Sequence, residues 1–180
     1  MTMLKQLLSI CLILLCIISC CEQHAEKKFL TQYEFEDYSL FSDVHIFIRG
    51  TDRYYNPIVF VSAPQLFDDS KYGCYVVVLD KNNQQVIRAG WMGEGPIEAD
   101  TLTLKKMAQC FLDYRIPRLD VDKQGNVFVY LRDVETLALV RFTDGSEIEK
   151  QNNKCDEKGI HYWERKWKKV RGNWYRYESK

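Results

Sequence analysis

In the stretch "DTLTLKKMAQCFLDYRIPRLDVDKQGNVFVYL" (residues 100–131), a helix pattern is followed directly by a strand pattern. Apolar side chains recur every three or four residues after Asp100, which is the spacing of one helix face. Aspartate is also a preferred residue for capping a helix N-terminus. The stretch therefore predicts an amphipathic helix over about residues 100–115, with a buried face formed by Leu104, Met107, Ala108, Phe111 and Tyr114.

The strand pattern after this helix predicts a β-hairpin. Pro117 lacks the backbone N–H that a helix interior needs, so the helix is expected to end before it. Two short alternating runs follow, at residues 119–122 and 126–131, with a turn between them. We expect Gly125 and Asn126 to take the unusual backbone dihedrals of that turn, because both residue types tolerate them.

The same turn has the spacing that begins a calcium-binding loop, with Asp120, Asp122 and Gly125 in the right order. Such a loop needs several oxygen ligands and ends in a bidentate glutamate at its twelfth position. This chain has Gln124 at the fifth position and Leu131 at the twelfth. We therefore expect a tight turn between two strands here and no metal site.

Outward from this stretch, the pattern of apolar residues predicts a sheet. Strands are expected at residues 43–49, 57–63, 74–79, 85–91 and 136–142, and a terminal hairpin is expected within residues 160–178. The run Val76–Leu79 is apolar on both faces, which predicts a central strand. Short turns join consecutive strands, so the pairing should be antiparallel. The expected fold class is α+β, a single domain that consists mainly of an antiparallel sheet with one amphipathic helix and a C-terminal β-hairpin.

The N-terminus carries a short apolar run that ends in cysteine. The run extends from Leu7 to Ile18, behind Lys5, and is shorter than the roughly 20 residues that cross a bilayer core. These features are typical of a cleaved secretory signal. The segment Ile17-Ile18-Ser19-Cys20 resembles the lipobox of bacterial lipoproteins, a family in which the signal is removed before the cysteine and the cysteine is acylated.

This resemblance implies a lipoprotein signal peptide over residues 1–19 and lipidation at Cys20. The chain would then be held in the bacterial cell envelope, most simply at the outer membrane, on its periplasmic or surface side. Residues 20–28 would form a polar tether and residues 29–180 the single domain; residues 29–41 fit either a helix or a strand. An ordinary secretory signal and a buried N-terminal helix are the alternatives.

Motifs for catalysis are scarce in this chain. Its three histidines are His24, His45 and His161, and none lies in a hydrolase or metalloprotease motif. Asp43 and His45 could form one edge of a metal site, but no second histidine or cysteine lies at ligand spacing. We therefore expect no catalytic residue, no metal and no cofactor, and His45 is interpreted as a polar-face strand histidine.

The cysteines after the lipobox do not indicate redox chemistry. Cys21, Cys74, Cys110 and Cys155 include no C-x-x-C pair. An exported chain could form disulfides from them, and four cysteines allow three full pairings, among which the sequence does not choose. Cys110 lies on the expected helix, where a free cysteine is the simplest interpretation.

Charge is distributed unevenly along the chain. Residues 160–180 hold seven basic and two acidic residues, whereas residues 20–159 hold 17 basic and 23 acidic ones. This balance lacks the broad basic field of a general nucleic-acid binder. The basic tail also alternates aromatic and cationic side chains, which makes it the candidate contact for a protein partner, through Trp163, Arg165, Trp167, Lys169, Arg171 and Trp174. Alternatively, the tryptophans pack on the sheet and the lysines are solvated.

These observations favour a lipid-anchored, non-catalytic envelope module that binds a macromolecular partner, for example an immunity protein against a toxin. The alternative is a small-ligand-binding or hydrolytic protein that uses a pocket on the sheet, with the carboxylate pairs Asp120/Asp122 or Glu94/Glu98 for acid–base work.

A third interpretation rests on residues 93–96 ("GEGP") and 119–130, which resemble pieces of lipid-anchored six-bladed β-propellers. It would make the chain a propeller-like fragment, although each piece occurs once and the mature chain is short for repeated blades.

Overall fold

A computed structural model of the chain describes residues 24–63, 73–82, 85–93, 100–132, 138–145, 148 and 166–178. The chain divides into two compact units, residues 1–35 and residues 36–180. The expected signal peptide and Cys20 lie outside the described residues. Within the described part of the chain, none of the helices is long and apolar enough to span a bilayer.

In the first unit, residues 24–33 form a helix. The rings of Phe29 and Tyr33, one helical turn apart, lie 5.2 Å from each other. The stretch 29–41, which fitted either helix or strand, is therefore helical through residue 33. The helix also includes residues 24–28, the second half of the expected tether.

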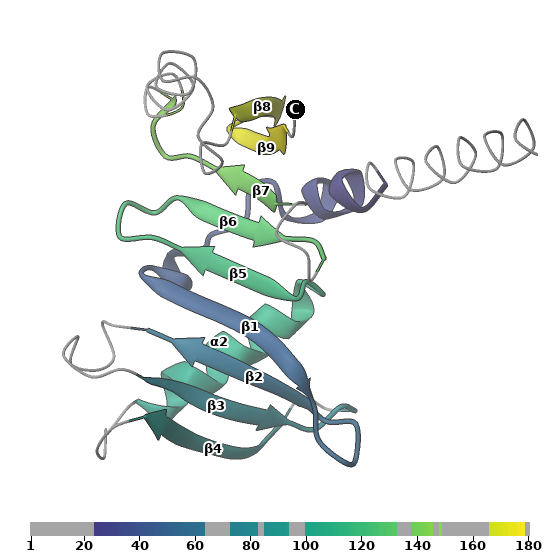
Figure 1. Cartoon of the computed structure of the whole chain (residues 1–180), viewed down its shortest axis with the longest axis vertical. Helices are drawn as coiled ribbons and strands as arrows, with labels where there is room; N and C mark the ends of the chain where they lie inside the picture. The colour runs from purple at the N-terminus through teal and green to yellow at the C-terminus, as the bar shows by residue number, and fades with distance from the viewer. Residues whose placement is uncertain are drawn as a thin grey trace, which may run out of the picture. The chain divides into compact units, whose positions relative to one another are not determined.

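The second unit is built on one antiparallel sheet (Figure 1). Its nine described strands pair in the order β4-β3-β2-β1-β5-β6-β7-β9-β8. Their bounds are β1 (Val44–Thr51), β2 (Pro57–Ser62), β3 (Gly73–Leu79), β4 (Val86–Gly93), β5 (Arg118–Val121), β6 (Val127–Tyr130), β7 (Ala138–Arg141), β8 (Lys166–Arg171) and β9 (Trp174–Glu178). A short 3-10 helix, η1 (Ser39–Phe41), precedes β1. The predicted α+β class, antiparallel pairing and C-terminal hairpin are confirmed.

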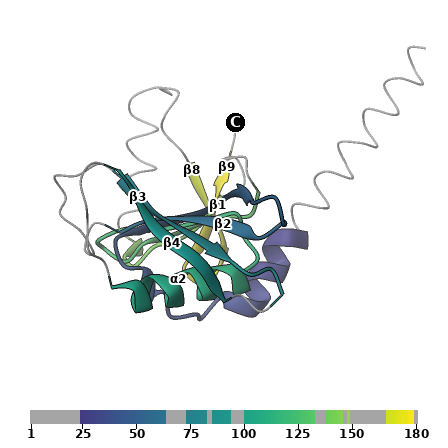
Figure 2. The same cartoon turned by 90° about the horizontal axis from the view of Figure 1, so that it is seen from below.

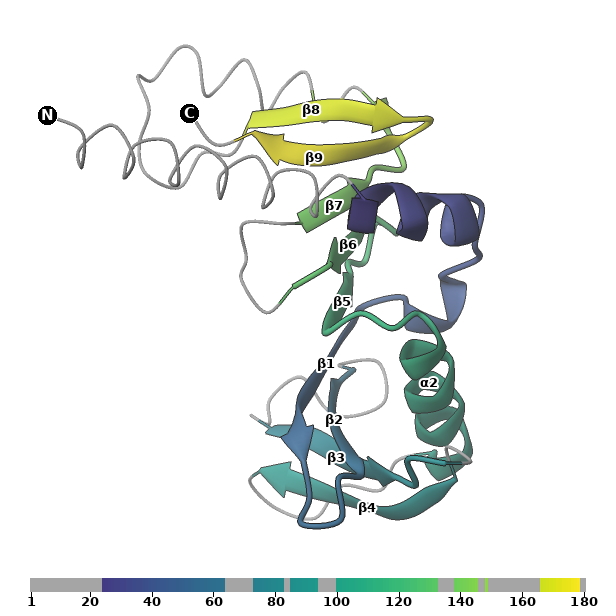
Figure 3. The same ribbon diagram turned by 90° about the vertical axis from the view of Figure 1, so that its right-hand side faces the viewer.

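The helix α2 (Thr101–Asp113) lies along one face of the sheet (Figures 2 and 3). Asp100 caps it as predicted, because its Oδ1 accepts hydrogen bonds from the backbone N–H of Leu102 at 3.0 Å and Thr103 at 3.3 Å. The predicted buried face is confirmed, with Leu104, Met107, Ala108, Phe111 and Tyr114 all buried. The helix ends at Asp113, slightly earlier than expected, and Arg115 then adopts a left-handed backbone with φ of 54°.

One strand lies elsewhere than its apolar pattern indicated. The run Val76–Leu79 predicted a central strand, but β3 is second from the edge, and β4 is the outermost strand on that side. Within this run Val77, Val78 and Leu79 are buried, while Val76 is partly exposed. An apolar run therefore records how well the two faces of a strand are covered and not its distance from the sheet edge.

Two hairpin turns in this sheet have the same hydrogen-bond pattern. In the β1–β2 turn, Asp52 Oδ1 accepts from Asn56 N at 3.0 Å and Asp52 Oδ2 accepts from Asn56 Nδ2 at 3.1 Å. In the β5–β6 turn, Asp122 and Asn126 form the same two bonds, each 2.8 Å long. In both turns the aspartate N–H also donates to the asparagine carbonyl. The turns are therefore structurally equivalent, five residues from aspartate to asparagine.

The β5–β6 turn confirms the predicted tight turn at Asp122–Asn126, with one correction. Gly125 has a φ of 81°, as expected, but Asn126 is not among the residues with positive φ. Its side chain has another role, since Asn126 Oδ1 accepts hydrogen bonds from the N–H and hydroxyl of Thr143 at 2.9 and 3.1 Å. The asparagine thus ties the turn to the chain just after β7.

We expect replacement of Asn56 by alanine to lower the free energy of unfolding by about 2 kcal/mol, because buried hydrogen-bonding groups would lose their partner. Asn56 is 7% exposed, and its Oδ1 accepts from the backbone N–H of Lys81 at 3.2 Å. Urea unfolding of Asn56→Ala measures the effect. Exposed Asn82, in the neighbouring turn, supplies the control Asn82→Ala, which should change stability by less than about 0.5 kcal/mol. Equal losses in the two variants would contradict this role of Asn56.

Candidate functional site

The face of the sheet opposite α2 carries an aromatic and cationic row of side chains. On β1, Val44 and Ile46 are fully buried, and His45 and Phe47 alternate with them and so lie on the other face. Phe47 pairs across strands with Phe60 on β2 and with Arg118 on β5. Arg118 in turn pairs with Tyr130 on β6. We call the side of the sheet defined by these side chains the open face.

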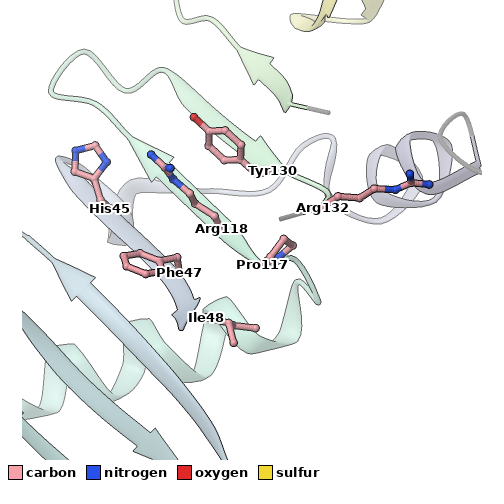
Figure 4. A pocket seen from close by; sticks show the side chains of 7 residues that line it. All are labelled: His45, Phe47, Ile48, Pro117, Arg118, Tyr130 and Arg132. Atoms are coloured by element: carbon pink, nitrogen blue, oxygen red, sulfur yellow. The ribbon is translucent and has the colours of Figure 1, made fainter. Parts of the chain in front are cut away.

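A pocket of about 320 Å³ lies on the open face. Its lining comes from β1, β5 and β6 and from the residues that flank them: His45, Phe47, Ile48, Pro117, Arg118, Tyr130 and Arg132 (Figure 4). In Figure 4 the Arg118 side chain extends between the His45 and Tyr130 rings. The volume is at the lower end of the range for small-molecule sites, roughly 300–1,000 Å³.

A buried carboxylate fixes two of the polar side chains at this pocket. Asp120 is 5% exposed, and its Oδ1 lies 3.2 Å from His45 Nδ1. The Arg118 Nε donates to both Asp120 oxygens, at 3.1 and 2.9 Å, and its Nη2 lies 2.6 Å from Oδ2. With Nδ1 held by the carboxylate, the second ring nitrogen of His45 is directed away from Asp120. The His45 and Arg118 side chains remain 56% and 39% exposed.

The same contacts shift two pKa values. The hydrogen bond to Asp120 raises the pKa of His45 above its usual 6.5, although burial acts in the opposite direction. Burial is the largest single effect on Asp120 and opposes its ionisation, but the hydrogen bonds and the charges of His45 and Arg118 together outweigh it. The pKa of Asp120 is therefore lowered, and the carboxylate is ionised at neutral pH.

We expect a His45→Gln variant to have a flatter dependence of stability on pH. A raised pKa in the folded protein means that protonated His45 stabilises the fold; this contribution is complete below pH 6.5 and is lost as pH rises through the folded pKa. Its size should be under about 1 kcal/mol, because the side chain is half exposed and solvent screens the pair. Thermal unfolding between about pH 5 and 8 measures it, with exposed His24→Gln as the control. A slope unchanged by His45→Gln would count against the His45–Asp120 contact.

Aromatic rings lie beside these polar groups. The guanidinium carbon of Arg118 lies 4.5 Å from the centre of the Tyr130 ring, and the rings of Phe47 and Phe60 are 5.4 Å apart. Stacking on Tyr130 and the fork to Asp120 together hold the Arg118 guanidinium in one orientation. The pocket therefore presents fixed hydrogen-bond donors beside aromatic surface, an arrangement that suits a small anion with an apolar body.

The sheet register places a serine beside the pocket histidine. Ser62 pairs with His45 from the side opposite Asp120, so a serine, a histidine and an aspartate lie in one cross-strand row. A hydrolase of this type needs a hydrogen bond between the serine hydroxyl and the histidine. Among the described residues, His45 is bonded to Asp120 and no bond between Ser62 and His45 is recorded.

The structure places the candidate partner-binding residues of the tail in different environments. Trp174 is 1% exposed and lies near Tyr38, with ring centres 6.3 Å apart; Trp167 is 8% exposed and lies 5.8 Å from Phe142. Lys169 and Arg171 are exposed. Trp163 and Arg165 lie outside the described residues. The two described tryptophans therefore pack against the protein's own aromatic side chains, and the cations between them face solvent.

The other candidate residues are not brought together into a site. Asp43 Oδ2 lies 3.7 Å from Lys123 Nζ, while His45 Nδ1 contacts Asp120. No group of three or more possible metal ligands occurs in the described parts of the chain. Asp120 contacts the pocket residues His45 and Arg118, whereas Asp122 belongs to the turn. Glu94 and Glu98 lie outside the described residues.

Two cysteines fall within the described residues, Cys74 and Cys110, and both are free thiols. Burial raises the pKa of both, which disfavours the reactive thiolate. Cys110 is thus the free helix cysteine that its pattern indicated. Cys21 and Cys155 lie outside the described residues.

Sequence reasoning did not identify Phe47, Arg118 and Tyr130 as site residues. Part of this information is in the sequence, because the alternation along β1 places His45 and Phe47 on the face opposite the apolar residues Val44 and Ile46. The missing information was the pairing of β1 with β5, which brings Arg118 beside Phe47. Comparison with known protein families, curated proteins and solved structures found no match.

Proposed function

We propose that this chain is a lipid-anchored protein of the bacterial cell envelope that binds a small organic anion, without a chemical step, in the pocket of the open face. The observation that carries the proposal is the set of contacts around Asp120. This one buried carboxylate orients His45 and Arg118 beside the rings of Phe47 and Tyr130.

An anion is the favoured ligand because of which polar groups remain accessible. The Asp120 side chain is only 8% exposed and accepts hydrogen bonds from His45 and Arg118. Its negative charge is therefore paired within the protein and is not presented to a ligand. The side chains of His45, Arg118 and Tyr130 contribute imidazole, guanidinium and phenol groups to the pocket. A carboxylate or phosphate group can pair with these donors while an apolar body contacts the aromatic rings.

A thermal-shift titration of the full chain against small aromatic and aliphatic carboxylates and phosphates tests this function. A ligand at about 100 times its Kd should stabilise the fold by about 2.7 kcal/mol and raise the melting temperature. The matched organic amines and alcohols should have no effect. If no acid in the panel gave a saturable rise, or if amines gave the same rise, the anion-binding function would be wrong.

The anchor is tested separately. Cys20 is the proposed acylation site, and more than one acyl chain is needed for stable membrane attachment. Labelling cells with a radioactive fatty acid should mark the wild-type chain and leave Cys20→Ser unlabelled. Incorporation of label into Cys20→Ser would refute this attachment point.

A protein partner at the basic C-terminal hairpin is the second candidate function, and the exposure of Lys169 and Arg171 favours it. These cations could orient an acidic partner surface, as charge complementarity does in fast-binding pairs. Co-purification from detergent-solubilised membranes would recover the partner in stoichiometric amounts. The double variant Lys169→Glu with Arg171→Glu should lose it, and Lys105→Glu on the exposed side of α2 should retain it. Failure to recover a stoichiometric partner would count against this function.

A further inference from the structure

The β1–β2 turn ends in an exposed cluster of aromatic and cationic side chains. Tyr54 is 59% exposed and Tyr55 is 74% exposed. The guanidinium of Arg53 lies 4.8 Å from the Tyr54 ring centre, and the Lys81 Nζ lies 5.7 Å from that of Tyr55. We call these four residues the tyrosine tip. The β1–β2 turn carries Arg53, Tyr54 and Tyr55 and lies at the lower right of Figure 1, and Lys81 follows the end of β3.

The equivalent β5–β6 turn forms the same aspartate–asparagine hydrogen bonds without tyrosine. Gln124 and Gly125 occupy the positions that correspond to Tyr54 and Tyr55, within the same aspartate–asparagine hydrogen bonds. Tyr55 has a φ of 65°, in the left-handed region where a side chain with Cβ is disfavoured and where the second turn uses glycine. An exposed tyrosine in a strained backbone gains little from its own protein, so a contact outside the chain is the better explanation.

The charges around the tip indicate what it contacts. The two nearby carboxylates, Asp52 and Asp80, are half-buried and accept backbone N–H groups within their turns, Asp52 from Tyr54 at 2.7 Å. Arg53 and Lys81 are exposed. The tip therefore presents amphipathic tyrosine rings flanked by cations. Tyrosine favours the headgroup level of a bilayer, and cations beside it can pair with lipid phosphates.

We propose that the tyrosine tip contacts the headgroup region of a phospholipid bilayer. The proposal rests in part on the proposed function, because acylation of Cys20 would hold the domain next to a membrane. A tethered contact forms at a high effective concentration, so a few side chains are sufficient to orient the domain.

Amide hydrogen exchange on the full chain, reconstituted in vesicles of phosphatidylethanolamine and phosphatidylglycerol, tests this contact. Exchange over residues 52–56 should be about tenfold slower in vesicles than in detergent solution, because bilayer contact restricts opening of the turn. Exchange over residues 122–126 should be unchanged, which makes the equivalent turn an internal control.

A variant that copies the second turn, Tyr54→Gln with Tyr55→Gly, separates folding from contact. Its melting temperature should be equal to or above that of the wild type, since glycine adopts the left-handed backbone without strain. The slowing of exchange over residues 52–56 should be lost while the variant stays in the vesicle fraction. Unchanged exchange in the wild type on vesicle binding would overturn the proposal, and so would persistence of the slowing in the variant; a glycan or protein partner for the tip would give the first of these results.

The two proposals fail in different ways. If Cys20 proved not to be acylated, the anchor would be wrong, and co-sedimentation of the unacylated chain with the same vesicles would decide the tip on its own. Binding that weakens by about tenfold in the double variant, or roughly 1.4 kcal/mol, would support the tip contact. Binding that is absent, or equal in the two proteins, would refute it.

Discussion

Replacement of Trp174 by alanine is expected to lower the free energy of unfolding by about 3–5 kcal/mol, the largest effect that we predict for a single substitution. Trp174 is 1% exposed and begins β9, which pairs with β7 on one side and β8 on the other. Its ring lies near Tyr38 and within 5.7 Å of the Arg141 guanidinium. Truncation to alanine would leave a cavity where the indole ring packs, and it would weaken the packing of the terminal hairpin against the rest of the sheet.

Denaturant unfolding of Trp174→Ala measures this loss, and Lys169→Ala on the same hairpin is the control. Because Lys169 is exposed, its truncation should change stability by less than about 0.5 kcal/mol. Similar small effects for both variants would mean that the hairpin is an appendage and not part of the core. The result also bears on partner binding by the tail. If Trp174 is needed for stability, the exposed cations of the hairpin are the groups that could contact a partner.

Replacement of Arg118 by glutamine is expected to weaken ligand binding at the open face by about 10- to 100-fold, as for loss of a charged hydrogen bond worth about 1.5–3 kcal/mol. Glutamine removes the charge and the fork that joins Arg118 to Asp120, and it cannot stack on Tyr130 in the same way. Arg118→Lys should bind with intermediate affinity, because it keeps the charge but not the planar geometry.

Calorimetric titration with the best acid from the thermal-shift panel measures these affinities. Arg88→Gln is the matched control, since Arg88 is an exposed arginine on β4, away from the pocket lining. Its affinity should equal that of the wild type. If Arg118→Gln bound as tightly as Arg88→Gln, the pocket would not be the binding site.

Local features of this fold were predictable from the sequence because they depend on residues close together in the chain. Asp100 and the apolar spacing after it define α2, and the alternating runs around Gly125 define the β5–β6 hairpin. The tail hairpin was predictable for the same reason. By contrast, the apolar run of β3 did not give its place in the sheet, because strand order depends on how distant segments pair.

The site was only partly predictable. Alternation places His45 and Phe47 on the face away from the core, but their partners Arg118 and Asp120 are more than 70 residues along the chain. The equivalence of the two turns was also hidden, since "DRYYN" and "DKQGN" share only the aspartate and the asparagine. Side-chain hydrogen bonds to the backbone define these turns, and that pattern becomes visible only in the folded chain.

The most direct test of the proposed function is an NMR titration of the His45 imidazole with the same organic acids. The chain has three histidines, so the His45 signals can be assigned by comparison with His45→Gln. The proposed function predicts a saturable shift of the His45 signals, little change at the other two histidines, and loss of the response in Arg118→Gln. Two results would contradict anion binding in the open-face pocket: no chemical-shift change at His45 with any acid, or an equal change in Arg118→Gln.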